Sequence, residues 1–260
     1  MKTIDLNCDL GESFGAWQMG DDAALLPLIS SANIACGFHA GDPDIMRRTV
    51  ALAITHSVAI GAHVSLPDLQ GFGRREFPVS AEQVHAITLY QIGALHAFTQ
   101  AAGSRLTHVK PHGALYNMAA RDRTLADAIA RAAHQFDPGL RLMGLAGSAL
   151  IDAGRALGLP VTAEAFSDRR YLADGSLQPR DEVGAVIDDA ALATAQALGI
   201  ARAGMVQTSE GRQIAIHADT LCIHGDGAHA AALARQLRLA LEAAGLRIAA
   251  PTESGSRGIR

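Results

Sequence analysis

Acidic, imidazole and cationic side chains recur in this 260-residue chain at or just after the ends of short apolar runs. They are Asp9 with Glu12, His39 with Asp42, His63, Lys110 with His112, Glu164 with Arg169, and His224 with Asp226. Carboxylates and imidazoles transfer protons or bind metal ions, and a lysine or arginine stabilises negative charge. Because side chains that follow parallel strands converge at one edge, the pattern predicts an active site assembled from distant segments.

Lys110 stands apart because lysine is almost absent from the chain. Of the 22 basic residues 20 are arginine, and the second lysine is Lys2 near the N-terminus. A base composition that favours alanine and arginine codons accounts for the arginines but leaves Lys110 unexplained. Lysine is a compact point charge whose pKa responds readily to burial. We therefore expect Lys110, alone or with Arg169, to hold a substrate anion or to stabilise oxyanion charge.

Two kinds of chemistry fit the remaining polar residues. Asp9, His39 and His63 form a set of one carboxylate and two histidines, which can hold a divalent metal ion with open positions for water. Alternatively, acidic residues and a histidine act as general acids and bases around a polar substrate. The candidates for this second role are Asp9, Glu12, His112, Glu164 and Asp226. The spacing of the residues leaves both chemistries open.

The elements that must position these residues are short strands that alternate with helices. Seven apolar runs have strand character, namely residues 3–10, 32–37, 58–64, 106–110, 140–145, 160–165 and 220–224. Helical patterns follow most of them, with Asp42 before Pro43 and Ser80 before Gln83 as N-terminal caps. This alternation predicts a parallel sheet with helical crossovers.

The phase of the strands distinguishes a closed barrel from an open sheet. Asp5, Asn7 and Asp9 share one face of the first strand, and the apolar residues between them share the other. An open doubly wound sheet is covered by helices on both faces and would be apolar on both. We therefore predict an α/β fold, a distorted (β/α)7 TIM-like barrel with its site at the C-terminal mouth.

The barrel is expected to form a single domain over residues 1–250, followed by a loose tail at 251–260. Residues 205–209 and 213–217 flank Glu210-Gly211 and predict a small β-hairpin inserted before the last strand.

Bulk composition excludes several classes of protein. A net charge of −4 and a pI near 6.2 provide no basic surface for a nucleic acid. The sequence contains no apolar run long enough for a membrane span, and its first residues do not resemble a secretion signal. Three cysteines without paired spacing predict reduced, buried thiols and a cytoplasmic location. The chain also lacks a GxxxxGK[ST] phosphate loop, the usual nucleotide-binding motif. The composition leaves homo-oligomerisation open.

Several segments taken together resemble the LamB/YcsF family. They are DLNCDLGE (5–12), NIACGFHAGD (33–42), GAHVSLPDLQGFGRR (61–75), VKPHGALYN (109–117), EAFSDRRY (164–171), GSLQPR (175–180) and CIHGD (222–226). The segments occur in order and span nearly the whole chain. Where the family usually reads GAHPSYPD, this chain has Val64 and Leu66 in place of the proline and tyrosine.

The resemblance implies a barrel of the glycoside hydrolase and deacetylase type and an enzyme that hydrolyses a cyclic amide. The implied reaction opens 5-oxoproline to glutamate and cleaves ATP to ADP and phosphate, together with two partners, the B and C subunits of a 5-oxoprolinase complex. A five-membered lactam resists opening, so coupling to ATP gives a reason for partners that help to bind the nucleotide. The residues expected to contact the substrate are Asn7, Asp42, Arg169 and His224.

Two alternative functions remain at this point. One is a metal-dependent deacetylase or amide hydrolase that acts without partners. The other is a non-catalytic binding or regulatory component of a complex.

Overall fold

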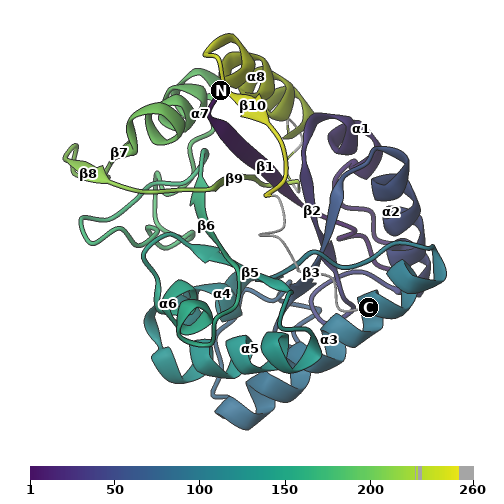
Figure 1. The fold of residues 1–260 in the computed structure, drawn as a ribbon. Helices are drawn as coiled ribbons and strands as arrows, with labels where there is room; N and C mark the ends of the chain where they lie inside the picture. The colour runs from purple at the N-terminus through teal and green to yellow at the C-terminus, as the bar shows by residue number, and fades with distance from the viewer. Residues whose placement is uncertain (226, 228–229, 252–260) are drawn as a thin grey trace.

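A computed structural model describes residues 1–225, 227 and 230–251, and its centre is a closed barrel of parallel strands surrounded by helices (Figure 1). The barrel strands are β1 (Thr3–Leu10), β2 (Ser31–Ala35), β3 (Ala59–Val64), β4 (His108–Pro111), β5 (Arg141–Leu145), β6 (Val161–Phe166) and β9 (Thr220–Ile223). Each strand pairs with the next in parallel, and β1 pairs with β9 to close the circle. The predicted seven-stranded barrel is therefore confirmed.

Helices cover the outside of the barrel. The main ones are α2 (Pro43–Thr55), α3 (Ala81–Ala101), α4 (Gly113–Arg121), α5 (Arg123–Phe136), α6 (Ala149–Ala156), α7 (Ala190–Leu198) and α8 (Ala230–Ala243). Asp42 caps α2 by accepting a hydrogen bond from the backbone N–H of Ile45, and Ser80 with Gln83 forms a capping box at α3. These two caps are as the sequence predicts.

Several short elements are not indicated by the sequence patterns. Helix α4 begins one residue after β4, so the sequence pattern assigns its first residue to the end of the strand. Helix α1 (Asp22–Leu25) is a single turn, and β10 (Arg247–Ile248) is too short to show a period. Strand β10 pairs with the first residues of β1, next to the stretch that pairs with β9.

The predicted hairpin is present as β7 (Met205–Gln207) and β8 (Gln213–Ala215), which pair antiparallel. It is shorter than expected and lies at the left of Figure 1, beside the barrel rather than within it. Before the hairpin, helix α7 is followed by a π-helical turn at Gly199–Ala203.

The two faces of the barrel strands differ in polarity. Ile4 and Leu6 join the apolar core between the barrel and its helices, whereas Asp5 and Asn7 hydrogen-bond to other strands across the interior. The barrel interior is thus filled by a polar network, and the hydrophobic core is the layer outside it. Burial of that layer stabilises the fold, and the interior is left for chemistry.

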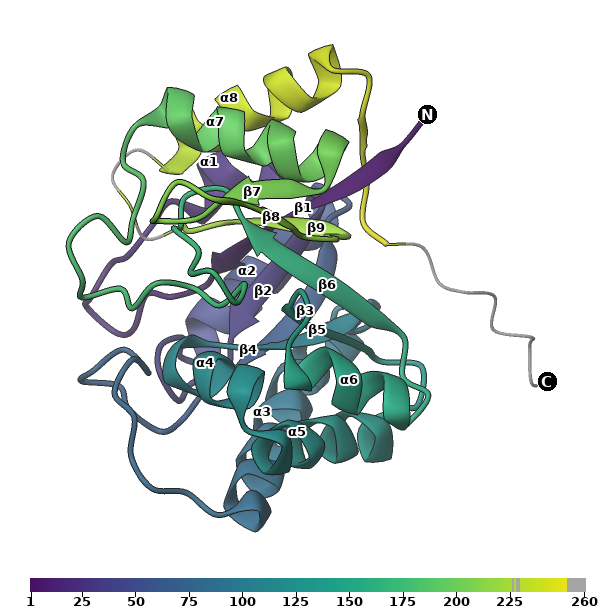
Figure 2. The same ribbon diagram turned by 90° about the vertical axis from the view of Figure 1, so that its left-hand side faces the viewer.

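The connections that follow β1, β3 and β6 gather at one end of the barrel, on the left in Figure 2. This end is the C-terminal mouth, where the polar segments of the sequence are expected to meet. None of the helices in the described ranges has both the length and the apolar character required to cross a membrane.

Candidate active site

Lys110 is the centre of the polar network inside the barrel. Its side chain is 2% exposed, and Nζ lies 2.9 Å from Asp9 Oδ1 and 2.8 Å from Glu164 Oε1. Nζ also donates to Asn7 Oδ1 at 3.2 Å and contacts Cys222 Sγ at 3.2 Å. These partners come from β1, β6 and β9, so the lysine ties three strands together.

The charges at this centre stabilise one another. Burial disfavours the ammonium form of Lys110, but the nearby carboxylates outweigh this effect and hold its pKa well above the usual value. Burial likewise disfavours ionised Asp9, yet His63 and Lys110 hold its pKa well below the usual value. Lys110 is therefore a cation and Asp9 an anion at neutral pH, an arrangement that places fixed charges where a reacting group can use them.

Besides its ion pair with Lys110, Glu164 accepts a hydrogen bond from outside the barrel. The hydroxyl of Tyr116, on α4, donates to Glu164 Oε2 at 2.7 Å. Burial and the adjacent carboxylate raise the pKa of Tyr116 well above its usual value, so the hydroxyl keeps its proton. Tyr116 lies within VKPHGALYN, but the sequence does not single it out because it falls in an unpredicted helix.

Deeper in the barrel, an amide and a histidine orient the carboxylate of Asp9. Asn33 Nδ2 donates to Asp9 Oδ1 at 2.8 Å, and Asn33 Oδ1 lies 2.8 Å from His108 Nε2. Burial, together with Lys110, lowers the pKa of His108 to about 3, so this histidine is neutral. Its ring fits against Gly61, where a Cβ atom would overlap the ring atoms. The glycine in β3 thus provides the space that His108 needs.

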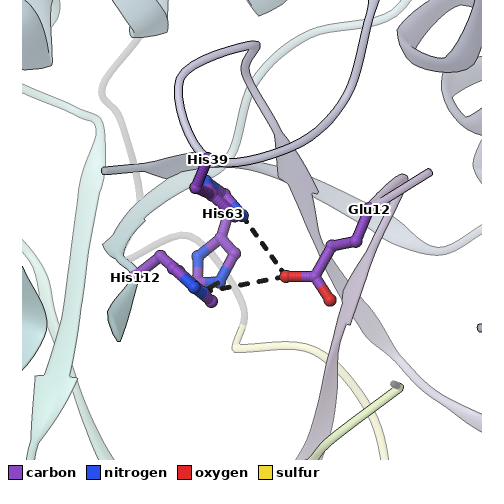
Figure 3. A group of neighbouring side chains, drawn as sticks. All are labelled: Glu12, His39, His63 and His112. Carbon is purple, nitrogen blue, oxygen red and sulfur yellow. Dashed lines mark hydrogen bonds and ion pairs between the residues drawn. The ribbon is translucent and has the colours of Figure 1, made fainter. Parts of the chain in front are cut away.

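Three histidines and a carboxylate form a second cluster beside Lys110 (Figure 3). Glu12, His39, His63 and His112 come from the ends of the first four strands, and each offers a ligand atom within 4.8 Å of the others. His39 Nε2 lies 3.3 Å from Glu12 Oε1, and His63 Nε2 lies 3.0 Å from His112 Nδ1. The rings of His39 and His112 stack at 3.9 Å.

This cluster could hold a metal ion, and it differs from the predicted metal set. Burial is the main cause that lowers the pKa values of His39 and His112 well below the usual value, with neighbouring histidines adding to it. Neutral imidazoles and a carboxylate are the donor set that zinc-class ions prefer. Glu12 and His112 join His39 and His63 here, whereas Asp9 lies 3.3 Å from His63 Nε2 and bonds to Lys110 and Asn33.

The third part of the mouth carries His224, Asp168 and Arg169. His224 Nδ1 lies 2.7 Å from Asp168 Oδ2, and this pairing lowers the pKa of Asp168 although burial opposes it. Arg169 is 6% exposed and donates through Nη2 to the backbone oxygen of Gln178, while its Nε has no hydrogen-bond partner among the described residues. Burial and nearby Arg180 lower the pKa of Arg169. A buried guanidinium with an unused N–H favours an anionic ligand.

A cavity of about 970 Å³ joins these groups. Its polar lining includes Asp9, Glu12, His63, Lys110, His112, Tyr116, Arg74, Arg121, Arg169, Arg180 and His224, together with the carboxylates of Glu76, Asp174 and Asp181. A smaller cavity of about 280 Å³ lies next to it, and Glu12 belongs to both. The larger volume is at the upper end of typical small-molecule sites.

Two of the predicted substrate-binding residues lie away from this cavity lining. Asn7 is fully buried below Lys110, where it donates to Thr220 and accepts from Asn33. Asp42 uses its two carboxylate oxygens to accept from the backbone N–H groups of Ile45 and Gly15. Both residues therefore have structural partners. The predicted catalytic residue Asp226 and the tail beyond residue 251 lie outside the described residues.

The cysteines are buried, as the sequence indicates. Cys222 faces Lys110 from β9, a contact that reasoning from the sequence missed although strand parity places both on the inner face. Burial is the main cause that raises the pKa of Cys222 well above its usual value, so the side chain is a thiol.

Comparison with known proteins identifies the family. The profile of the LamB/YcsF family matches residues 4–256. The chain belongs to the LamB/YcsF family.

Relatives in the LamB/YcsF family match the chain over almost its full length. The A subunit of 5-oxoprolinase from Methylococcus capsulatus is 57% identical over 249 residues, which cover 96% of each chain. The A subunit of 5-oxoprolinase from Bacillus subtilis is 52% identical over 256 residues, which cover 98% of this chain and all of the relative. The crystal structure of a lactam utilization protein from Thermus thermophilus superposes with a TM-score of 0.90 at 51% identity, covering 96% of this chain and 99% of that one.

Proposed function

We propose that this chain is the A subunit of a 5-oxoprolinase and opens the lactam ring of 5-oxoproline to give glutamate. The observation that carries the proposal is the identity of 52–57% to curated relatives of that name, with nearly full coverage on both sides. The polar barrel mouth supports it, because hydrolysis of an amide needs a cation for the carbonyl oxygen and an acceptor for the proton of water.

The chemistry of the substrate assigns roles to two cations of the cavity lining. 5-Oxoproline carries a carboxylate, and Arg169 offers a buried guanidinium with an unused N–H for it. Lys110 supplies a second positive charge, which would stabilise negative charge on the lactam oxygen or on a phosphoryl group attached to it. Glu12 and neutral His112 line the same cavity, where they are suited either to take the proton of the attacking water or to hold an ion that activates it.

ATP has a thermodynamic role in this proposal. A lactam is a stable amide, and conversion of its oxygen into a phosphate ester makes the ring carbon susceptible to water. The chain has no phosphate loop, so ATP would be bound largely by the B and C subunits, which would transfer phosphate to the lactam. The barrel would then add water to the activated ring. The cavity volume leaves room for the substrate together with a phosphoryl group.

Reconstitution with the partner subunits tests the proposal. Glutamate formation from 5-oxoproline and ATP is expected only when this chain and both partners are present. Glutamate formation at an undiminished rate without this chain would make its role regulatory instead. Release of acetate or amine from simple amides by this chain alone, without ATP, would favour the deacetylase alternative.

A further inference from the structure

We propose that Glu12, His39, His63 and His112 bind one divalent transition-metal ion of the zinc class. The proposal goes beyond lactam opening, since it concerns an ion that neither the family nor the names of the relatives assign. It rests on the convergence of these four side chains, whose nitrogen and oxygen atoms point toward one another (Figure 3).

The backbone fixes the protons on two of the rings. His63 Nδ1 lies 3.1 Å from the carbonyl oxygen of Lys110, and His112 Nε2 lies 2.9 Å from that of Phe72. A carbonyl oxygen only accepts hydrogen bonds, so both of these nitrogens must carry the proton. The second nitrogen of each ring, Nε2 of His63 and Nδ1 of His112, is therefore the one that can present a lone pair to a metal ion.

These two nitrogens face each other. His63 Nε2 and His112 Nδ1 are only 3.0 Å apart, and both are placed to donate a lone pair to one shared cation. Asp9 Oδ2, another acceptor, lies 3.3 Å from His63 Nε2. Acceptors that converge at this distance repel one another unless a cation lies among them. Nζ of Lys110 does not meet this need, because it is directed to Asp9 Oδ1 and Glu164.

The remaining members of the cluster complete a coordination sphere. Glu12 Oε1 lies 3.3 Å from His39 Nε2 and 3.7 Å from His112 Nδ1. A tetrahedral zinc ion with bonds of about 2.1 Å separates its ligand atoms by about 3.4 Å. Three of the six separations are 3.0, 3.3 and 3.7 Å and bracket this value, and all six lie within 4.8 Å.

The surroundings of the cluster have a second property of metal sites. Histidine ligands usually donate their outer N–H to a carbonyl or carboxylate, which fixes the ring and increases its basicity. The carbonyls of Lys110 and Phe72 play this part for His63 and His112. All four candidate ligands are buried, and they are held by separate strand ends, so the site is formed before the ion arrives. When bound, such an ion would polarise a carbonyl oxygen or activate water.

Metal analysis of the purified full-length chain tests the proposal directly. After removal of metal with a chelator and titration with Zn²⁺, about one equivalent is expected to bind per chain. Co²⁺ in place of Zn²⁺ is expected to give visible absorption bands of a four- or five-coordinate ion with nitrogen ligands. Zn²⁺ binding at less than 0.1 equivalent, with no Co²⁺ bands, would overturn the proposal.

Variants define the ligand set. His112→Gln, His39→Gln and Glu12→Gln should each weaken Zn²⁺ binding by about 100-fold or more, because loss of outer-shell partners alone weakens metal sites by about 10–100-fold. His85→Gln is the matched control, since His85 lies on α3 and contacts Gln135 instead. Equal weakening in the control would overturn the assignment, as would loss of the ion in Asp9→Asn with retention in Glu12→Gln.

Circular dichroism and thermal unfolding of each variant separate loss of the ion from loss of the fold. The metal content of the unmodified chain remains decisive even where a variant fails to fold. Because Zn²⁺ binding is measured without ATP, lactam or the partner subunits, a negative result would leave the proposed function standing. Lactam turnover by a metal-free complex would likewise not bear on whether the ion binds.

Discussion

Replacement of Lys110 by methionine tests the electrostatic logic of the barrel interior. The substitution keeps the length of the side chain but removes the charge that bonds to Asp9 and Glu164, whose side chains are 9% and 0% exposed. Removal of one partner from a buried ion pair destabilises a protein by about 3–5 kcal/mol, because the remaining charge is left without compensation. At about 2–4 °C per kcal/mol for a chain of this size, the melting temperature should fall by about 10 °C.

The loss of stability should also depend on pH. Without the ammonium group, two carboxylates remain within 3 Å of the vacated Nζ position, and the folded state relieves their repulsion by binding a proton. The unfolded chain binds no such proton at neutral pH, so the folded state holds one proton more. Stability then falls as pH rises, and the difference from wild type should grow by about 1.4 kcal/mol per pH unit.

Urea unfolding of wild type and Lys110→Met between about pH 6 and pH 8 measures both the loss of stability and its change with pH. Arg121→Met is the matched control, because Arg121 pairs with Glu76 at the surface, where both side chains are about half exposed. Arg121→Met should lower the free energy of unfolding by about 0–1 kcal/mol, and this loss should not vary comparably with pH. A loss below about 1 kcal/mol for Lys110→Met, constant with pH, would refute the reasoning.

Turnover by the reconstituted complex tests the catalytic role of the same residue. Lys110→Arg keeps the charge, but a planar guanidinium cannot replace a point charge that contacts four atoms from three strands. Glutamate formation should therefore fall sharply in both Lys110→Met and Lys110→Arg. Full turnover in both variants would exclude a role for Lys110 in the reaction.

Three further predictions concern other parts of the molecule. Burial raises the pKa of Asp5 from 3.8 to about 6. The favourable contribution of the Asp5 carboxyl to folding stability is therefore complete below pH 3.8, and it is lost as pH rises through about 6. Asp5→Asn should therefore stabilise the fold by about 1–3 kcal/mol at pH 7 but not at pH 4. Urea unfolding at the two pH values measures this difference, and an equal effect at pH 4 and pH 7 would contradict the prediction. Gly61→Ala forces a Cβ into the ring of His108 and should destabilise the fold by about 1–3 kcal/mol in thermal melts. Gly93→Ala, in open space on α3, should stabilise it by about 0.5–1 kcal/mol, so equal effects would refute the steric argument. Arg169→Gln should raise the KM for 5-oxoproline about tenfold or more with a smaller change in kcat, and an unchanged KM would exclude a carboxylate contact.

The barrel was predictable because strand parity is a local property. Alternation in Thr3–Leu10 places Asp5, Asn7 and Asp9 on one face whatever the rest of the chain does, and the structure keeps them there. The position of Lys110 on the inner face follows from the same rule. Helix α4 and strand β10 escape prediction because one overlaps a strand end and the other has only two residues.

The grouping of side chains at the mouth was less predictable. The sequence places Glu12, His39, His63 and His112 at strand ends, but which atoms meet depends on loop paths and ring orientations. Those orientations are set by backbone carbonyls such as that of Phe72, 40 residues from His112. The hydrogen bond from Tyr116 to Glu164 likewise depends on how α4 turns back over the barrel. These contacts are tertiary, and no local pattern encodes them.

Closure of the barrel between β1 and β9 has a consequence for how the chain folds as it is synthesised. Asn7 meets Thr220 across 213 residues of sequence, and the partners of Lys110 include groups from both closing strands. A nascent chain that has delivered only β1 to β6 can assemble part of the sheet, but its lysine and carboxylates remain open to water on one side. Contacts of such long range form late. A chain truncated before β9 is therefore expected to remain an open, protease-sensitive intermediate, and the emergence of the last barrel strand becomes the step that commits the molecule to its native state.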